Sequence, residues 1–209
     1  MSNDPKISDI RRATPRPETR AEEQPRELEG LIHQVLLRLG EDPERPGLLR
    51  TPARIANALS FLTSGYQQTV EDVVEGAVFP DDCDEMVVVK DVEFYSQCEH
   101  HMLPFFGRVH VGYIPDGKII GLSKIARVVD VFARRLQVQE RMTAQIASFL
   151  QEVLNPKGVA VVVEGAHMCA MMRGVKKSQV NMTTRTMLGV FKDDPQERAE
   201  FLSLISKAP

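Results

Sequence analysis

Two short runs of this chain, roughly seventy residues apart, hold the side chains that are best suited to chemistry. The first run contains Cys98, His100 and His101, and the second contains His167 and Cys169. Cys98 and His101 are three positions apart, so one turn can present both to a single metal ion, and Cys169 can supply a third ligand. Two thiolates and one imidazole suit Zn²⁺, and three protein ligands leave a fourth position for water. A metal, a water molecule and two further imidazoles together indicate hydrolytic chemistry.

The metal interpretation has competitors that the spacing alone leaves open. The alternative is that both cysteines are buried thiols and His101 is an ordinary surface histidine. Cys83 competes as the third ligand, but it stands among Asp81, Asp82 and Asp84, whose negative charges oppose formation of a thiolate. We therefore expect Cys83 to be a loop residue without a metal.

The other two imidazoles, His100 and His167, stand next to the expected ligands. In that place they are candidates for proton transfer during a reaction. The alternative is that each ring packs or makes a hydrogen bond to a backbone carbonyl.

Basic side chains gather at places where an anion can bind. Ser123, Lys124 and Arg127 are expected to open a helix, with Ser123 as its N-cap, and backbone N–H groups at such an end attract anions. Arg173 follows the second cysteine run and Arg54 opens an earlier helix, so a phosphate-binding set is a candidate interpretation. The simpler alternative is solvated surface charge. The chain contains neither G-x-x-x-x-G-K-[ST] nor G-x-G-x-x-G, so side-chain cations rather than a glycine-rich loop would hold a nucleotide.

Gln139 and Glu140 are expected to begin another helix. A carboxylate that faces a pocket can accept hydrogen bonds from the N1–H and 2-amino groups of guanine. The alternative is a glutamate in the first turn that the helix dipole favours without any ligand. Local sequence alone supports the second explanation better.

Composition excludes several classes of protein. The 209 residues suit one domain with a tail, and the net charge of −3 argues against a nucleic-acid binder that relies on basicity. We find no apolar run of about 18 residues to span a membrane and no apolar segment typical of a secretory signal near the N-terminus. Three cysteines leave one over in any disulfide pairing, which favours reduced thiols and a cytoplasmic location.

The pattern of apolar residues predicts the elements that position these groups. Residues 1–25 are expected to be a flexible tail and residues 26–209 a single domain, with two helices over 26–66 and a core over 85–209. In the second of those helices Thr51 is the expected N-cap and Pro52 the first residue. The core is expected to contain strands at 86–89, 92–95, 106–114, 158–164 and 180–191, and helices from Ser123, from Val138 and from Pro195. The fold class is therefore α+β, an antiparallel sheet with two helices on one face, and its open edges suggest oligomerisation.

Five sequence blocks of this chain resemble those of GTP cyclohydrolase I and occur in the same order, and the resemblance covers about residues 27–206. The blocks that carry the resemblance are Leu49-x-Thr51-Pro52-x-Arg54, Ser96-x-Cys98-Glu99-His100-His101, Gly121-Leu122-Ser123-Lys124, Gln137-Val138-Gln139-Glu140-Arg141 and His167-x-Cys169-x-x-x-Arg173-Gly174. Several blocks that match in one order are much more specific than any single block.

The resemblance implies a tunnelling fold that assembles as a homodecamer with active sites between subunits. It also implies conversion of GTP and water to 7,8-dihydroneopterin triphosphate and formate, which leads to folate and other pterins. The Zn²⁺ ligands would be Cys98, His101 and Cys169, with water activated for attack on C8 of guanine. Catalysis would involve His100, His167 and Ser123, and substrate binding would involve Gln139, Glu140, Lys124, Arg127, Arg173 and Arg54. No nucleic acid and no membrane are implied.

Two other classes of function remain open on the sequence. The first is a zinc-stabilised protein that binds the nucleotide without turnover, although pure binding would not need two imidazoles beside the metal. The second is a relative of the tunnelling fold that uses a cysteine nucleophile and no zinc, such as the nitrile reductase of queuosine synthesis. Sensitivity to a chelator separates zinc chemistry from thiol chemistry.

Overall fold

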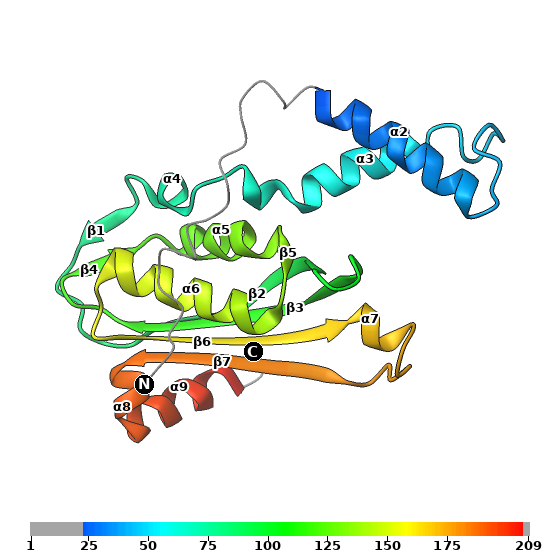
Figure 1. Ribbon diagram of the computed structural model, residues 1–209. Helices are drawn as coiled ribbons and strands as arrows, with labels where there is room; N and C mark the ends of the chain where they lie inside the picture. The colour runs from blue at the N-terminus through cyan, green and yellow to red at the C-terminus, as the bar shows by residue number, and fades with distance from the viewer. Residues whose placement is uncertain (1–22, 207–209) are drawn as a thin grey trace, which may run out of the picture.

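The computed structural model describes residues 23–206 of the chain (Figure 1). The tail expected over residues 1–25 lies almost entirely outside the described residues. Its last residues belong to the first described helix, α2 (Glu23–Arg38), which begins a few residues earlier than expected.

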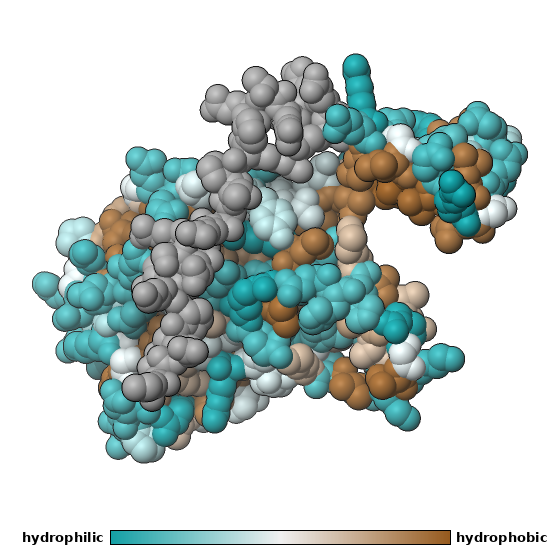
Figure 2. Space-filling model, in the orientation of Figure 1, coloured by the Kyte–Doolittle hydropathy of each residue, from teal (hydrophilic) through white to brown (hydrophobic). Residues whose placement is uncertain are grey.

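Helices α2 and α3 (Thr51–Leu62) pack against each other and form an arm that projects from the body of the molecule (Figure 1). Gly40, with a φ of 86°, turns the chain after α2. The expected cap of α3 is wrong by one residue, because Arg50 occupies the N-cap position and Thr51 is already helical. Large apolar side chains of the arm remain exposed, including Leu31 and Leu39, and Figure 2 shows apolar surface facing the hollow between the arm and the body.

A short connecting region joins the arm to the sheet. It contains a 3₁₀ turn, η2 (Ser64–Tyr66), and helix α4 (Val70–Val74), whose cap is the Thr69 side chain. Strand β1 (Val78–Pro80) then pairs with β4 (Lys118–Ile120) in a separate two-stranded sheet. The chain turns over residues 115–117, with Gly117 at a φ of 76°, and β4 then pairs outside the main sheet.

The main sheet has five strands in the order β5-β2-β3-β6-β7. Their bounds are β2 (Val87–Cys98), β3 (Pro104–Ile114), β5 (Leu136–Gln137), β6 (Gly158–His167) and β7 (Asn181–Gly189). The four long strands are antiparallel, as predicted, whereas the short β5 runs parallel to β2. The two strands expected at 86–89 and 92–95 are one strand interrupted by a bulge between Val89 and Val92.

Two helices cover one face of this sheet, as expected: α5 (Leu122–Ala133) and α6 (Gln139–Leu154). The apolar stripe of α5 is buried there, because Ile125, Val128, Val129 and Phe132 recur at helical spacing. The opposite face is partly covered by α8 (Val190–Asp193) and α9 (Pro195–Ser206), which form a second, smaller core (Figure 1). The chain is therefore an α+β protein with helices on both faces of its sheet.

The cap of α5 differs from the prediction. Gly121 occupies the N-cap position, and Ser123 lies inside the first turn with its side chain exposed. The helix therefore begins one residue before the predicted cap.

Strand register brings the two chemical runs to one end of the sheet. Phe105 of β3 lies opposite His167 of β6, and Pro104 lies opposite Gln97, which precedes Cys98. The short helix α7 (Met168–Met171) follows His167 at that end and carries Cys169. Within residues 23–206, no helix is long and apolar enough to cross a membrane.

Candidate active site

Cys98, His101 and Cys169 form the candidate metal site. One ligand atom from each of these residues lies within 4.8 Å of the other two. Cys98 is buried, Cys169 is half-buried and His101 is exposed, so the group opens toward solvent on one side. The first prediction from the sequence, that these three residues come together, is thus confirmed.

A tight turn after β2 returns His101 to the thiol of Cys98. The N–H of Cys98 donates to the carbonyl of Leu103 at 2.9 Å, and the N–H of Met102 donates to the carbonyl of Cys98 at 2.8 Å. Met102 adopts a left-handed conformation, with a φ of 52°, which closes the turn. As a result, Nδ1 of His101 lies 3.9 Å from Sγ of Cys98.

These distances fit a tetrahedral ion. Zn–S bonds near 2.3 Å and Zn–N bonds near 2.0 Å would place neighbouring ligand atoms about 3.5–3.8 Å apart, so small side-chain movements complete the set. Burial first, and then the neighbouring Cys98, raise the pKa of the Cys169 thiol. Binding of a metal would therefore displace thiol protons, which makes its affinity increase with pH.

His167 lies beside this group in a fixed orientation. Its ring stacks on Phe105, with 4.6 Å between centroids and 4° between planes. Nε2 of His167 lies 2.9 Å from Oε1 of Gln139. Burial lowers the pKa of His167, and the nearby Glu140 carboxylate opposes that shift.

The amide of Gln139 determines which nitrogen of His167 carries a proton. Nε2 of Gln139 donates to the carbonyls of Val163, at 3.1 Å, and Met182, at 2.9 Å, so Oε1 must be the atom that faces His167. An amide oxygen can only accept, and Nε2 of His167 is therefore the donor. In the neutral ring Nδ1 is then left with a lone pair.

Gln139 is consequently not placed as a substrate contact. Only 1% of the residue is exposed, and both ends of its amide are already occupied. Its neighbour Glu140 is exposed in the first turn of α6. The sequence could place both residues at the start of a helix, but it could not show which one faces the β6–β7 carbonyls.

His100 lies at the open side of the metal group. Its side chain is exposed, and its Nδ1 lies 3.7 Å from Sγ of Cys98. The rings of His100 and His101 are 6.2 Å apart in an edge-to-face arrangement. Of the two predicted imidazoles, His100 thus lies next to a ligand atom, whereas His167 ends β6 two residues before Cys169.

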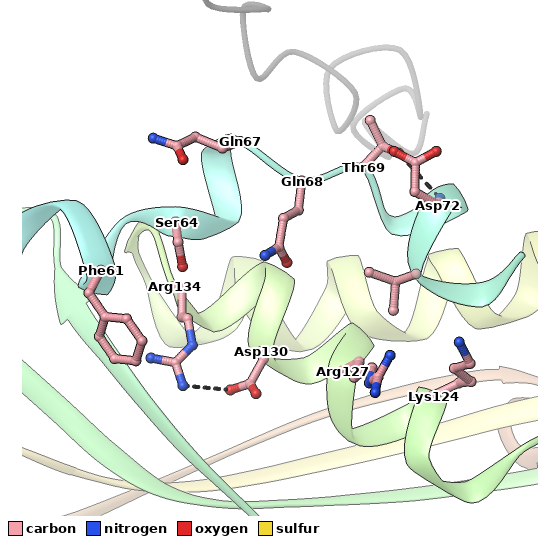
Figure 3. A pocket seen from close by; sticks show the side chains of 11 residues that line it. Phe61, Ser64, Gln67, Gln68, Thr69, Asp72, Lys124, Arg127, Asp130 and Arg134 are labelled. Carbon is pink, nitrogen blue, oxygen red and sulfur yellow. Dashed lines mark hydrogen bonds and ion pairs between the residues drawn. The ribbon is translucent and has the colours of Figure 1, made fainter. Parts of the chain in front are cut away.

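Lys124 and Arg127 line a different part of the molecule, a cavity of about 540 Å³ between α5 and the α3–α4 segment. Figure 3 shows both side chains rising from α5 toward the segment that carries Gln68 and Thr69. A third cation, Arg134, is paired there with Asp130 at 3.5 Å. Asp72 also lines the cavity, so its three cations face two carboxylates and leave a small excess of positive charge, on which an anion could bind.

The cavity runs along α5, from Lys124 in its first turn to Arg134 just after its last residue. The C-terminal end of α5 leads into β5, which pairs with β2 at Cys98. The 12 residues of α5 span roughly 18 Å, and Lys124 lies in the first turn. Within one chain, Lys124 therefore lies at the end of α5 away from the candidate metal site, and Arg127 lies in the middle of the helix.

The remaining predicted residues are exposed. Arg54 lies on the outside of α3, Ser123 in the first turn of α5, and Arg173 in the turn that follows α7. Arg173 is near Cys169 in the sequence, whereas Arg54 belongs to the projecting arm. The positive charge of Arg173 acts to lower the pKa of the Cys169 thiol, against the larger effect of burial, so Arg173 lies close enough to interact with that candidate ligand.

One pair beside the metal group was given no role by the sequence. Glu99, between Cys98 and His101, makes an ion pair with Arg141 of α6. Both residues stand in the sequence blocks quoted above, but an exposed arginine on a helix carries no local signal of a specific partner.

Known proteins resemble the chain over most of its length. A family described as GTP cyclohydrolase I matches residues 28–206. A GTP cyclohydrolase 1 of Chlorobium chlorochromatii is 57% identical over 180 residues, which cover 86% of this chain and 81% of that protein. A GTP cyclohydrolase 1 of Rattus norvegicus is 57% identical over 171 residues, covering 82% and 71%. The apo crystal structure of an archaeosine synthase covers 50% of this chain and 93% of its own, with a TM-score of 0.41 and 21% identity.

Proposed function

The chain belongs to the GTP cyclohydrolase I family and acts on GTP, and from this premise we propose that it is a zinc-dependent enzyme. The proposed reaction converts GTP and water to 7,8-dihydroneopterin triphosphate and formate, the first step of folate and related pterin synthesis. The observation that carries the proposal is the meeting of Cys98, His101 and Cys169 beside the oriented imidazole of His167.

The donor set supports zinc as the metal. Two sulfur atoms and one nitrogen suit Zn²⁺ better than Mg²⁺ or Ca²⁺, which prefer oxygen. When bound to Cys98, His101 and Cys169, Zn²⁺ would supply a Lewis acid that activates water for attack on C8 of guanine.

The imidazoles would handle the protons. Nδ1 of His167 is the nitrogen left available once Nε2 donates to Gln139, so Nδ1 is the proposed site of proton exchange with the guanine ring. His100, exposed at the open side, would serve the later opening of the purine or ribose ring. Protonation of N7 by one of these two groups would make the ring carbon a better target.

Recognition of guanine is assigned to Glu140. Its exposed carboxylate can accept hydrogen bonds from the N1–H and 2-amino groups. Adenine lacks this pair of donors and would leave the carboxylate unpaired in the complex, so it should be rejected strongly. Gln139 would contribute indirectly, through the orientation of His167.

The triphosphate is assigned to Lys124, Arg127, Arg173 and Arg54, with Ser123 near the ribose. Because Lys124 lies in the first turn of α5 and the candidate metal site lies beyond the other end of that helix, we propose that Lys124 and Arg127 serve the metal group of a neighbouring subunit. Arg54, on the projecting arm, would reach a neighbouring subunit in the same way.

Open sheet edges support this assembly. Among the described residues, β7 pairs only with β6, and β2 pairs with β5 only at its last two residues. Edge strands of this length are normally covered or paired. We propose a tunnelling fold in which neighbouring sheets join edge to edge into rings, with two rings forming a homodecamer. Three free cysteines fit a reducing compartment, which we take to be the cytoplasm.

Purified protein incubated with GTP tests the proposal. Formate release and the fluorescence of oxidised neopterin are followed with and without a tight chelator. Both products should form and both should disappear with chelator. A folded, zinc-loaded protein that forms neither product would indicate a nucleotide-binding protein, and chelator-resistant turnover would indicate thiol chemistry.

A further inference from the structure

The turn that joins two of the metal ligands is tied to helix α6. Glu99 is the residue directly after Cys98, and its carboxylate pairs with the guanidinium of Arg141. This hydrogen bond is also the main reason that the pKa of Glu99 is lowered. The contact joins two parts of the chain that are 42 residues apart.

Arg141 is itself held by the body of the protein. Its Nε donates to Oε1 of Gln137 at 3.1 Å, and its terminal nitrogen donates to the carbonyl of Leu136 at 3.3 Å. A planar guanidinium with several fixed donors loses less freedom than a lysine would in making the same contacts.

Gln137 extends this network into the core. It is 2% exposed, and its amide donates to the carbonyl of Phe132 at 2.9 Å and to Oε1 of Gln145 at 2.8 Å. Buried polar groups that are fully hydrogen-bonded tend to fix a single arrangement. Arg141 is thus the link between a rigid interior network and the exposed turn.

A second contact holds the same turn from the backbone. The N–H of Glu99 donates to the carbonyl of Gln137 at 3.0 Å. Glu99 is therefore anchored to one short segment, residues 136–137, both directly and through Arg141. Glu99 is exposed like its neighbours His100, His101 and Met102, but its two contacts attach the turn to the body.

We propose that Arg141 and Glu99 are positioning residues that hold the turn from Cys98 to His101 in the geometry that binds the metal. The proposal rests on the metal site proposed above. Neither residue touches the ion. They act by restricting how far His101 can move from the thiol of Cys98. Cys98 is the last residue of β2 and is therefore fixed by the sheet.

Simple charge attraction is too weak to explain such a role. The two side chains are 45% and 33% exposed, and ion pairs of this exposure contribute little to folding. Groups that orient metal ligands have a larger effect on the metal than on the fold, typically about 10–100-fold in affinity. The expected signature is therefore a weakened metal with a nearly unchanged unfolding temperature.

The experiment measures the affinity of the metal-free full chain for Zn²⁺ by competition with a chromophoric chelator. The variants are Glu99→Gln, Arg141→Met, Arg141→Lys and the double variant Glu99→Gln/Arg141→Met. Each single variant should weaken zinc by about 10–100-fold, and the double variant should be no worse than the poorer single one, since both break one contact. Absorption of the Co²⁺ form should change as well, because it reports ligand geometry.

The matched control is another arginine–glutamate pair. Arg45 and Glu41 form an exposed ion pair at 3.0 Å in the segment after α2, far from the metal group in the sequence. Glu41→Gln and Arg45→Met should leave zinc affinity within about twofold of the parent, as expected for an exposed pair.

Two results would overturn the proposal. One is zinc affinity within threefold of the parent in all the Glu99 and Arg141 variants. The other is an equal loss in the Glu41 and Arg45 controls. A parent protein that binds no zinc would instead refute the metal site itself. If Arg141→Met does not fold, Glu99→Gln decides the question alone, because it changes only an exposed side chain.

Discussion

Nε2 of His167 donates a hydrogen bond to Oε1 of Gln139 over 2.9 Å, and this contact connects the candidate catalytic ring to the interior of the sheet. The amide nitrogen of Gln139 is held in turn by Val163, Met182 and Thr184. The ring of His167 cannot turn over without breaking that arrangement. The orientation of an exposed site is therefore set by a buried residue.

Replacement of Gln139 should reduce the rate of reaction more than substrate binding. In Gln139→Leu the ring of His167 loses its acceptor, and we expect kcat to fall roughly 10–100-fold, because positioned proton transfer contributes about 10²–10⁴-fold. KM for GTP should change by less than about threefold, which steady-state kinetics measures. The comparison variant is Glu140→Gln, which should mainly raise KM. An unchanged kcat in Gln139→Leu would refute the role of this contact.

Gly165 offers a second way to disturb the same contact. A Cβ at this position would lie 3.3 Å from Cδ of Gln139 and closer still to its Oε1. Gly165→Ala should therefore displace the Gln139 amide and lower kcat with little effect on zinc content. Gly76→Ala provides a control, since a Cβ there meets nothing within 4 Å, although its φ of 65° adds local strain. Normal kcat in Gly165→Ala would show that the amide tolerates displacement.

Loss of one thiol should remove metal and activity together. We expect Cys169→Ser to bind less than about a tenth of the parent's zinc after dialysis and to release no formate, because a hydroxyl is a poor zinc ligand. Zinc content by elemental analysis and formate release are measured on the same sample. Cys83→Ser is the matched control, since Cys83 lies outside the ligand group, and it should retain both properties. If Cys169→Ser releases formate as fast as the parent protein, Cys169 is not a ligand of a catalytic metal.

Removal of a cation from the α5 cavity should weaken binding of GTP. Lys124→Ala and Arg127→Ala should each raise KM roughly tenfold or more, because hydrogen bonds to charged groups contribute about 1.5–3 kcal/mol. The effect should shrink as salt is added. Lys118→Ala removes the same charge from an exposed residue just before α5 and should leave KM nearly unchanged. If KM is the same in Lys124→Ala, Arg127→Ala and Lys118→Ala, the α5 cavity does not bind the triphosphate.

His110 should make the fold less stable in mild acid. It is buried, and its Nδ1 accepts a hydrogen bond from the N–H of Asp91, which only the neutral ring can do. Burial lowers its pKa; Asp91 and Glu164 oppose this shift, and Arg108 and Lys90 add to it. In the unfolded chain the pKa of a histidine is about 6.5, so as the pH is lowered below that value the unfolded chain gains a proton that the folded protein does not. The free energy of unfolding therefore decreases as the pH is lowered, until the pH is below the pKa of His110 in the folded protein.

Denaturant unfolding of the parent and His110→Gln between pH 7.5 and 5 checks this expectation. Glutamine can keep an acceptor near Asp91 but does not titrate, so the variant should lose part of the pH dependence. Identical pH profiles for His110→Gln and the parent would contradict the assignment.

Features of the site that depend on local spacing could be predicted from the sequence. Cys98 and His101 are three residues apart, so a single turn brings their side chains together without help from distant parts of the fold. Most long strands and helices were also predicted, because their apolar residues repeat at the required period. The helix of Gln139 and Glu140 begins where the pattern indicated.

Features that depend on contacts between distant elements could not be predicted. Gln139 is buried because β6 and β7 present two carbonyls to it, and no local pattern contains that information. The link from Glu99 to Arg141 depends on where α6 begins relative to the end of β2. The caps of α3 and α5 were misplaced by one or two residues, because several neighbouring residues compete for such positions.

The pairing of Phe105 with His167 gives a way to detect chains that fold with the wrong strand register. Side chains alternate between the two faces of a strand, so a slip of β6 by one residue against β3 would turn His167 to the wrong face and displace Cys169. Such a slipped chain could still be compact and largely apolar inside. It would not bring Cys98, His101 and Cys169 together, so under the proposed zinc site the zinc retained by a refolded sample would measure the fraction of correctly aligned molecules.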